Sequence, residues 1–598
     1  MVLALLIAAL SLAPLAGTAE AIGAAAIAAY AEERVEGELI AAGLHGSFRY
    51  AQDLHTGAFV ESDDLGPYSG ESGFDGKRPW ERDASREVLV HETATARAAA
   101  ISTAYRNRFG YLHPEPNVTL SVLPAQSREG KSFEIVHVEI KDGRPFDLWI
   151  DPATHLPARV TDLDDTKAHS IEYADYRRVS GVAVPFSVRD VPLNPRNRSE
   201  YRVKTVTFSK SGSAQAFAIP PAAPADYTVA GPLPAVVPFT MESNHLIVDV
   251  TLEGKPARAI FDTGGRNVLT PELAKALGLT ETGSLIGAGA GEGTVKIALT
   301  RARSLGFGAI TMRDQNFSVI SLPSAITHGG DRPVEMIVGY EILKRFVTRI
   351  DYAARTLTFT PAGAFTYRGN GVAVPMLFDD TTPRVRGSLD GLPGLFQIDT
   401  GSAGSLTLTS PFVAANDLRH KYKIAGNVVT GRGVGGYSHS DLARGGTLML
   451  GAVAVSDPVL ELSTDTRGAF GSREYAANVG NDVLRRFTIT FDYARRMMYM
   501  ERTPAGAFPP PPNRSGMYAQ NDDRRYFEVV DVLPNGPAAT AGLRAGDHIT
   551  AVDGKPADSL TADQFWTLLR GPAGTAHTFI VDRGGTSTTL TLTLRDVV

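Results

Sequence analysis

The sequence of 598 residues contains no cysteine. Without a thiol, the chain forms no disulfide, performs no thiol catalysis and builds no thiolate metal site. A lipid-modified cysteine near the N-terminus is excluded as well. The compartment stays open, because exported proteins can lack disulfides.

The sequence also lacks an excess of positive charge. It has 59 Lys and Arg against 65 Asp and Glu, for a net charge of −6, and no basic stripe with interleaved aromatic residues. Its 13 histidines show neither a His-Glu-x-x-His motif nor zinc-ligand spacing. We therefore expect no nucleic-acid partner, no metal and no cofactor.

Long apolar runs are missing apart from residues 2–16, which precede the small-x-small sequence Ala19-Glu20-Ala21. This order is typical of a secretory signal, although the usual basic residues are absent and the first cation is Arg34. The run is short for a membrane span. We expect a signal peptide over residues 1–21, export to the periplasm or envelope, and no stable membrane span; an uncleaved apolar helix is the alternative.

The remaining chain is too long for one core, and short strands separated by turn residues dominate it. The pattern predicts a mostly β, multidomain protein. We place a β-rich N-terminal domain at 22–230, two β lobes at 239–366 and 367–505, and a C-terminal domain at 514–598. Within the first domain, helices are predicted over Ala24–Gly43 and Thr93–Arg108.

Two triplets are the most informative motif: Asp262-Thr263-Gly264 and Asp399-Thr400-Gly401 each follow an apolar run. Each also opens a segment that ends alike, in Gly339-Tyr340-Glu341-Ile342-Leu343 and in Gly480-Asn481-Asp482-Val483-Leu484. A repeat this regular predicts two homologous units, each supplying one carboxylate to a shared site.

Paired carboxylates suit water-mediated hydrolysis. Two close carboxyl groups share one proton, so the ionised partner accepts a proton from water while the protonated partner donates to a carbonyl. We expect Asp262 and Asp399 to be catalytic. Thr263 and Thr400 are expected to bond the backbone of the opposite lobe, and Gly264 and Gly401 to permit the tight turn. The alternative is that both aspartates are turn residues.

A glycine-rich stretch follows each triplet, at residues 287–293 and 431–436. The second fits the dinucleotide pattern G-x-G-x-x-G, but no helix signal follows it. A mobile hairpin over the cleft is the interpretation we favour, and a plain flexible loop is the alternative.

With these motifs, residues 240–500 resemble a bacterial aspartyl protease of the retropepsin-like kind, with two lobes fused in one chain. The resemblance implies that Ile337-Val338-Gly339 and Asn478-Val479-Gly480 support the triplets, with Asn478 as a departure from the apolar pattern. Ser402 follows the second triplet and could hydrogen-bond Asp399, whereas Gly265 cannot do so for Asp262. We therefore expect Asp399 to be ionised and Asp262 to hold the proton.

Residues 536–554 (Gly-Pro-Ala-Ala-Thr-Ala-Gly-Leu-Arg-Ala-Gly-Asp-His-Ile-Thr-Ala-Val-Asp-Gly) closely resemble the core of bacterial PDZ domains. Such α+β domains bind an extended peptide, often a protein C-terminus, as an added strand. The resemblance implies a groove between the strand Tyr526–Val530 and the helix Ala562–Leu569. Candidate pocket residues are Phe527, Val529, Phe565 and Leu568, for each of which core packing is the alternative.

The N-terminal domain faintly resembles the half-barrel of LolA-like lipoprotein-sorting carriers, through Gly73-Phe74-Asp75-Gly76, Trp80 and the segment Phe146–Asp151. The resemblance implies a concave apolar surface. The sequence as a whole predicts an aspartic endopeptidase acting on a peptide or protein substrate. A non-catalytic envelope scaffold that binds peptides, or a protein that handles lipids or lipoproteins, are the alternatives.

Overall fold

The computed structural model describes residues 13–83, 86, 88–113, 115–163, 169–192, 194–221, 224–378, 381–503, 512–522 and 524–598. The chain divides into two compact units. One comprises residues up to Pro224 together with Thr282–Ile286, and the other comprises Ala225–Glu281 and Gly287–Val598. Most of the expected signal peptide lies outside the described residues, which begin in helix α2 (Ala13–Ile22).

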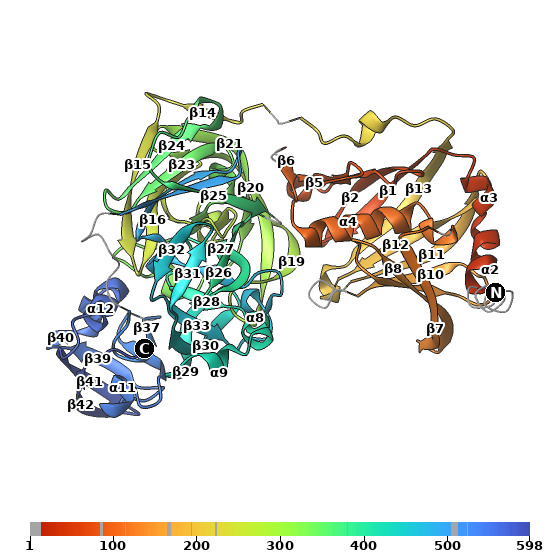
Figure 1. Ribbon diagram of the computed structural model, residues 1–598. Helices are drawn as coiled ribbons and strands as arrows, with labels where there is room; N and C mark the ends of the chain where they lie inside the picture. Colours follow the sequence, from red (N-terminus) through yellow and green to blue (C-terminus); the bar gives the residue numbers. More distant parts are fainter. Residues whose placement is uncertain are drawn as a thin grey trace. The chain divides into compact units, whose positions relative to one another are not determined.

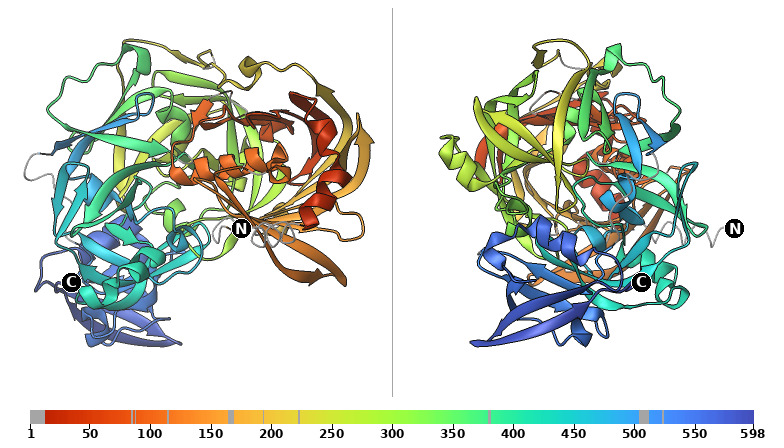
Figure 2. Two further views of the ribbon diagram at one scale, coloured as in Figure 1. Left: turned by 45° about the vertical axis from the view of Figure 1, so that its right-hand side comes forward. Right: turned by 90° about the vertical axis from the view of Figure 1, so that its left-hand side faces the viewer.

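The N-terminal unit is one curved antiparallel sheet of 13 strands. In its order β6-β5-β4-β3-β2-β1-β13-β12-β11-β10-β9-β8-β7, strand β1 lies between β2 and β13. Helix α4 (Ala94–Asn107) packs inside the curve of this sheet (Figures 1 and 2). The strands are β1 (Glu32–Ala41), β2 (Leu44–Asp53), β3 (Phe59–Asp64), β4 (Gly70–Phe74), β5 (Pro79–Arg82), β6 (Val88–Val90), β7 (Val118–Arg128), β8 (Lys131–Ile140), β9 (Phe146–Ile150), β10 (Pro157–Asp162), β11 (Ser170–Val179), β12 (Val182–Val191) and β13 (Ser199–Ser209).

One helix prediction in this unit is confirmed and one is wrong. Helix α4 begins after Thr93, whose hydroxyl accepts a hydrogen bond from Ala96 N–H at 3.1 Å, as an N-cap does. The helix predicted over Ala24–Gly43 is limited to α3 (Ala24–Ile27). Beyond it the chain forms β1, which pairs along its length with both β2 and β13. Tertiary pairing therefore overrides the helix propensity of the local sequence.

The second unit contains two lobes built on the same plan. In the first, β17 pairs with β16 and lies parallel to β22; in the second, β27 pairs with β26 and lies parallel to β34. The strands are β14 (Tyr227–Val229), β15 (Ala235–Glu242), β16 (His245–Leu252), β17 (Lys255–Phe261), β18 (Val268–Leu269), β19 (Thr282–Ala288), β20 (Thr294–Phe307), β21 (Ile310–Val319), β22 (Met336–Val338), β23 (Phe346–Asp351), β24 (Thr356–Pro361), β25 (Val372–Phe378), β26 (Pro383–Leu389), β27 (Leu392–Ile398), β28 (Leu406–Leu408), β29 (Gly426–Gly433), β30 (Gly436–Arg444), β31 (Thr447–Leu450), β32 (Val453–Ser456), β33 (Val459–Ser463), β34 (Ala477–Val479), β35 (Phe487–Asp492) and β36 (Met497–Arg502).

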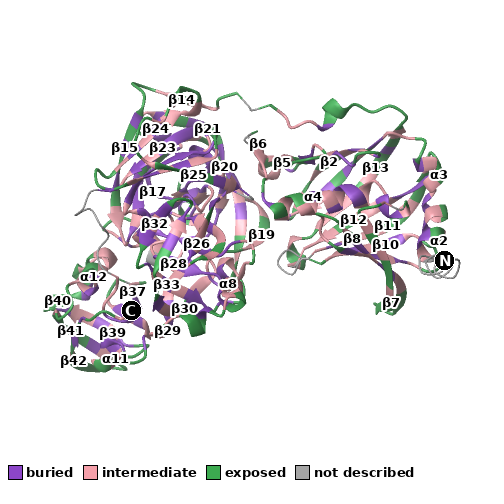
Figure 3. Ribbon diagram, in the orientation of Figure 1, coloured by how far each residue is buried: buried purple, intermediate pink, exposed green. Residues whose placement is uncertain are grey.

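The two lobes are joined by a shared antiparallel sheet in the order β15-β24-β23-β35-β36-β25, to which each lobe gives three strands. At its centre β23 pairs with β35, and every residue of β35 is buried. Figure 3 shows how buried residues concentrate in the strands of the lobes. The strands that follow the two repeated segment endings therefore pair with each other within one chain.

The C-terminal part of this unit is a small α+β domain with its own core. Its sheet has the order β37-β38-β39-β41-β42, with β40 beside β39. Buried Phe527, Val529, Ile549 and Phe565 belong to one apolar cluster there. The strands are β37 (Met517–Gln520), β38 (Phe527–Val532), β39 (His548–Val552), β40 (Lys555–Pro556), β41 (Ala576–Arg583) and β42 (Thr586–Thr593).

The remaining helices are short and lie at strand connections. They are α5 (Pro271–Ala276), α6 (Ser324–Thr327), α7 (Tyr340–Leu343), α8 (Ser410–Ala415), α9 (Leu418–Lys421), α10 (Asn481–Leu484), α11 (Pro537–Thr540) and α12 (Ala562–Leu569). In the described part of the chain, no helix has the length and apolarity that a membrane crossing requires.

Candidate active site

Asp262 and Asp399 lie at equivalent places, each directly after the buried strand of its lobe that runs beside a parallel partner. Asp262 N–H donates to Val338 O at 2.8 Å, and Asp399 N–H donates to Val479 O at 3.1 Å. The two carboxyl groups meet between the lobes and share a hydrogen bond. Each also accepts a backbone N–H from the glycine of its own triplet, Gly264 at 2.6 Å and Gly401 at 2.9 Å.

The threonines of the triplets tie the two aspartate loops together. Thr263 N–H donates to Thr400 Oγ1 at 2.9 Å, and Thr400 N–H donates to Thr263 Oγ1 at 3.0 Å. Each hydroxyl then donates across the lobe boundary, to Ile398 O at 2.8 Å and to Phe261 O at 2.9 Å. This exchange is the contact expected for the two threonines, and it fixes one aspartate relative to the other.

Asp262 and Asp399 are both half-buried. Burial, followed by the negative charge of Asp399 and the hydrogen bond with it, raises the pKa of Asp262 well above its ordinary value. A proton on Asp262 relieves the repulsion that two adjacent carboxylates would suffer. The raised pKa therefore favours the protonated form of Asp262, the direction expected for this aspartate.

The donor to the outer oxygen of Asp399 is Asn478 rather than Ser402. Asn478 Nδ2 donates to Asp399 Oδ2 at 2.8 Å, and Asn478 Oδ1 accepts from Gln397 at 3.1 Å, which fixes the orientation of the amide. Ser402 contacts Asp399 through the backbone, its N–H donating to Asp399 O at 3.3 Å, and among the described contacts its hydroxyl makes no hydrogen bond to the carboxylate. The role expected of Ser402 is thus corrected, because β34 runs parallel to β27 and brings Asn478 beside the carboxylate.

Gly339 and Gly480 occupy positions that leave no room for a side chain. A Cβ on Gly339 would lie 1.8 Å from Asp262 O, and one on Gly480 would lie 2.5 Å from Gly404 O. Real Cβ atoms do not approach backbone oxygens so closely, so both positions require glycine. The absence of a side chain at these glycines lets the end of each supporting strand contact the aspartate loop of its lobe.

The two glycine-rich stretches form hairpin tips that meet each other. Gly291 N–H donates to Val434 O at 3.1 Å, and Gly293 N–H donates to Gly435 O at 2.8 Å. Beside them, the Glu292 carboxylate accepts from Thr466 N–H at 2.6 Å and from its hydroxyl at 2.9 Å. The tips therefore touch across the two lobes.

A cavity of about 370 Å³ lies beside Asp399 and is lined by both lobes and the C-terminal domain. Asp399 and Ser402 face it from the aspartate loop, while Tyr518 on β37 and Trp566 on α12 face it from the C-terminal domain. Polar contacts hold these walls: Arg432 on β29 pairs with Asp522 at 2.9 Å, and Tyr437 donates to Gln520 at 2.7 Å.

The groove expected in the C-terminal domain is displaced by one strand. Strand β38, which corresponds to the predicted Tyr526–Val530, is flanked by β37 and β39 and so has no free edge for an added strand. The sheet has edges at β37 and β42, and β37 is the edge next to the predicted strand. Of the four candidate pocket residues, Phe527, Val529 and Phe565 are fully buried in the domain core, and Leu568 packs partly buried against it.

Sequence reasoning missed His245, which lies on β16 and lines the same cavity. Its side chain hydrogen-bonds the backbone of Gly401, and burial lowers the pKa of its imidazole despite the nearby charge of Asp399. A lone histidine in a strand carries no signal of its own. Asn478, in contrast, was visible as a departure from the apolar pattern. Within the described residues, no cluster of His, Asp and Glu is arranged to hold a metal ion.

Comparison with known families identifies two segments. Residues 248–342 match the aspartyl protease family model, and residues 528–583 match a PDZ domain model. The first contains Asp262 with its supporting strand, and the second contains the core of the C-terminal domain. The resemblance to a retropepsin-like protease followed by a PDZ domain is confirmed for these segments, which imply interactions with peptides or proteins.

Among curated proteins, the chain is 35% identical over 77 residues to a carboxy-terminal-processing protease from Bartonella bacilliformis. The match covers 13% of this chain and 18% of that protein's length. Together with the family matches, it supports a peptidase.

Among solved structures, the chain is similar to a DUF1329 family protein from Desulfovibrio piger, with a TM-score of 0.27 at 11% identity, over 34% of this chain and 96% of that one. It is also similar to a LolA superfamily protein from Nitrosomonas europaea, with a TM-score of 0.25 at 8% identity, over 33% and 97%. These TM-scores are too low to carry an argument about the N-terminal unit.

Proposed function

We propose that the two lobes form an aspartic endopeptidase with Asp262 and Asp399 as its catalytic residues. The observation that carries the proposal is the hydrogen bond between two half-buried carboxyl groups whose loops are held together by reciprocal threonine bonds. Two carboxylates held this close repel each other, which lowers the stability of the fold. A role in hydrolysis therefore explains the pair better than a purely structural role does.

In the proposed mechanism, ionised Asp399 accepts a proton from the attacking water, and Asp262 donates its proton to the oxygen of the scissile carbonyl. The water oxygen bonds to the carbonyl carbon, and the tetrahedral intermediate then expels the amine as it is protonated. No covalent enzyme intermediate forms. Asn478 supports the ionised state of Asp399, and the flap tips close over the peptide.

The test is digestion of a random peptide library with the full-length protein, with and without pepstatin, over acid to neutral pH. We expect cleavage by the wild type, inhibition by pepstatin, and loss of at least about a thousandfold in rate for Asp399→Asn or Asp262→Asn. Absence of cleavage at every pH would overturn the enzyme proposal and favour the peptide-binding scaffold.

For the PDZ domain we propose that a peptide or protein C-terminus adds to the free edge of β37, beside α12. The ring of Tyr518 on β37 lies 5.7 Å from that of Trp566 on α12, which bounds the groove on the cavity side. Loss of peptide binding in Trp566→Ala, with the domain still folded, is the expected result. Unchanged affinity would contradict this placement.

The N-terminal unit has a separate cavity of about 420 Å³, whose lining includes Val35, Phe59 and Val203. This cavity favours a second candidate role, binding of an apolar ligand such as an acyl chain. Titration of a fluorescent fatty acid into the full-length protein tests it, and saturation at one site per chain is the expected result. The apolar N-terminal stretch leads us to propose export to the periplasm or envelope, which a reporter fusion would check.

A further inference from the structure

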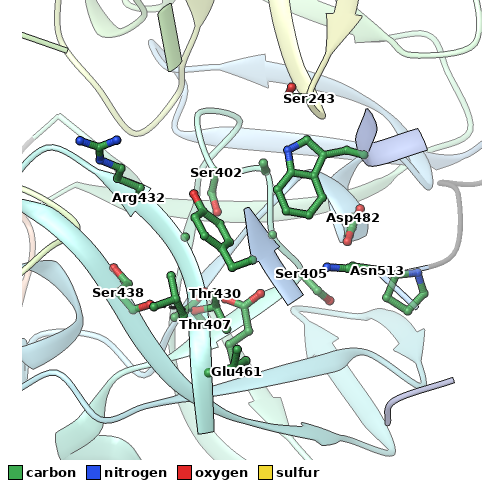
Figure 4. A pocket seen from close by; sticks show the side chains of 18 of the residues that line it. Ser243, Ser402, Ser405, Thr407, Thr430, Arg432, Ser438, Glu461, Asp482 and Asn513 are labelled. Atoms are coloured by element: carbon green, nitrogen blue, oxygen red, sulfur yellow. Dashed lines mark hydrogen bonds between the residues drawn. The ribbon is translucent and has the colours of Figure 1, made fainter. Parts of the chain in front are cut away.

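Glu461 is a carboxyl group in the active-site cavity that the proposed mechanism does not use. It lies on β33 and lines the same cavity of about 370 Å³ as Asp399. Figure 4 shows its side chain with those of Thr407, Thr430 and Ser405 around this cavity. Such a volume falls within the range of ordinary ligand sites.

The protein gives Glu461 hydrogen bonds but no opposite charge. Thr407 Oγ1 donates to Glu461 Oε2 at 2.6 Å, and the backbone N–H of Ser405 donates as well. Among the described residues, no Lys, Arg or His forms an ion pair with Glu461. The arginines that line the cavity are committed elsewhere: Arg432 to Asp522 and Gln520, while Arg570 acts electrostatically on Asp482.

The hydrogen bonds around Glu461 therefore do not explain why this position carries an acidic side chain. A glutamine at this position would accept both hydrogen bonds through its amide oxygen, so the packing needs an acceptor and not an acid. An unpaired carboxylate away from water is costly. Accordingly, burial, with a further contribution from nearby Asp482, raises the pKa of Glu461 to about 7.

We propose that Glu461 forms the base of a specificity subsite that binds a basic side chain, Lys or Arg, of the substrate peptide. The inference rests on the proposed endopeptidase function and names its substrate preference. An ammonium or guanidinium group supplies both the donors and the positive charge that Glu461 lacks, and charge-assisted hydrogen bonds in a desolvated site are strong.

The preference depends on pH in a defined direction. Glu461 is ionised above about pH 7 in the free protein. The groups facing it are Asp482, which raises its pKa, and the neutral donors Thr407 and Ser405. Discrimination in favour of a basic side chain therefore rises as the pH increases through about 7.

The test uses the full-length protein and peptide pairs that differ only by Lys or norleucine at one position, walked along the sequence. At one position we expect kcat/KM to favour Lys by about tenfold or more. In Glu461→Gln this ratio falls to about one. The matched control Glu272→Gln, an exposed carboxyl at the first turn of α5, keeps the wild-type ratio. A purely structural role would lower both rates equally and leave the ratio unchanged.

Two further measurements make each outcome decisive. Acetylation of the peptide lysine removes its charge and lowers kcat/KM of the wild type to the norleucine value, which requires no variant to fold. Peptide pairs with a reduced scissile bond report affinity without turnover: tighter binding of the Lys form to wild type than to Glu461→Gln supports the subsite. Cleavage without a preference for Lys overturns the subsite but not the catalytic dyad. Absence of cleavage overturns the dyad. In that case the ratio of the two affinities decides whether the subsite exists.

Discussion

At the scale of single residues, the two aspartates of the dyad differ because their neighbours differ. Asp399 receives a side-chain donor from Asn478, while the corresponding position in the first lobe is Ile337, which cannot donate. Burial and the adjacent charge favour the protonated form of Asp262. The asymmetry of the pair therefore comes from one amide on a supporting strand.

Replacement of Asn478 by Leu removes the donor to Asp399 and so disfavours its ionised form. We expect the lower apparent pKa of the pH–rate profile to rise by about one unit. Full pH profiles of kcat/KM on one peptide provide the measurement. Ser402→Ala serves as the control and leaves the acidic limb in place; a shift in this control instead would return the role to Ser402.

At the scale of elements, the catalytic loops depend on contacts that cross from one lobe to the other. Thr400 Oγ1 both accepts from Thr263 N–H and donates to Phe261 O. Replacing it with a methyl group leaves a buried donor and a buried acceptor without partners.

Thr400→Val tests this cross-lobe contact. We expect the free energy of unfolding to fall by about 3 kcal/mol, since each unsatisfied buried polar group costs about 1–3 kcal/mol. Denaturant unfolding of the full-length protein measures the change. Thr311→Val, at an exposed position on β21, is the matched control and shifts stability little; equal effects of the two changes would argue against the lock.

The flaps give a second prediction at this scale. A Cβ on Gly291 would lie 2.5 Å from the carbonyl carbon and oxygen of Gly435, so Gly291→Ala forces the tips apart. We expect KM to rise several-fold, because a closed flap contributes to substrate binding. In Gly363→Ala, where nothing lies within 4 Å of the added Cβ, KM stays at the wild-type value. An unchanged KM in Gly291→Ala would show that tip contact does not matter for binding.

At the scale of the whole molecule, the stability of the N-terminal unit depends on a buried carboxyl group, that of Glu33. In the N-terminal unit Glu33 is 5% exposed, and its partner Gln52 donates at 2.6 Å. Burial raises the pKa of Glu33 to about 7 from its ordinary value of 4.5. A raised carboxyl pKa means that folding favours the protonated form, so its stabilising contribution is complete below pH 4.5 and is lost as the pH rises through about 7.

The N-terminal unit should therefore lose stability between pH 5 and 8, by up to about 3 kcal/mol from Glu33. Hydrogen exchange of peptides from this unit within the full-length protein measures the loss. Glu33→Gln makes the dependence shallower and leaves the part due to Glu61 and Asp63, whose pKa values burial raises to about 7 and about 6. Glu36→Gln, exposed on the same strand β1, preserves the wild-type slope. A profile equally steep in Glu33→Gln would place the titrating group elsewhere.

Much of the second unit could be predicted from the sequence, because its signals are local or repeated. The triplets, the repeated segment endings and the turn-rich core of the C-terminal domain each carry their information within a few residues. Helix α12 begins and ends at the predicted residues. The N-terminal helix over 24–43 was wrong for the opposite reason: β1 pairs on one side with β13, which lies far along the chain and leaves no local signal.

The sequence by itself determined which carboxylates face each other and that two like lobes present them, since a repeated motif needs no coordinates to be recognised. Only the tertiary structure decided what surrounds them. Parallel pairing of β34 with β27 brought Asn478 to Asp399. The order of the C-terminal sheet left β37, and not β38, as a free edge. The fold also placed Glu461 in the cavity without a cation. These features depend on neighbours distant in the chain, and long-range packing, unlike local motifs, leaves no short-range pattern.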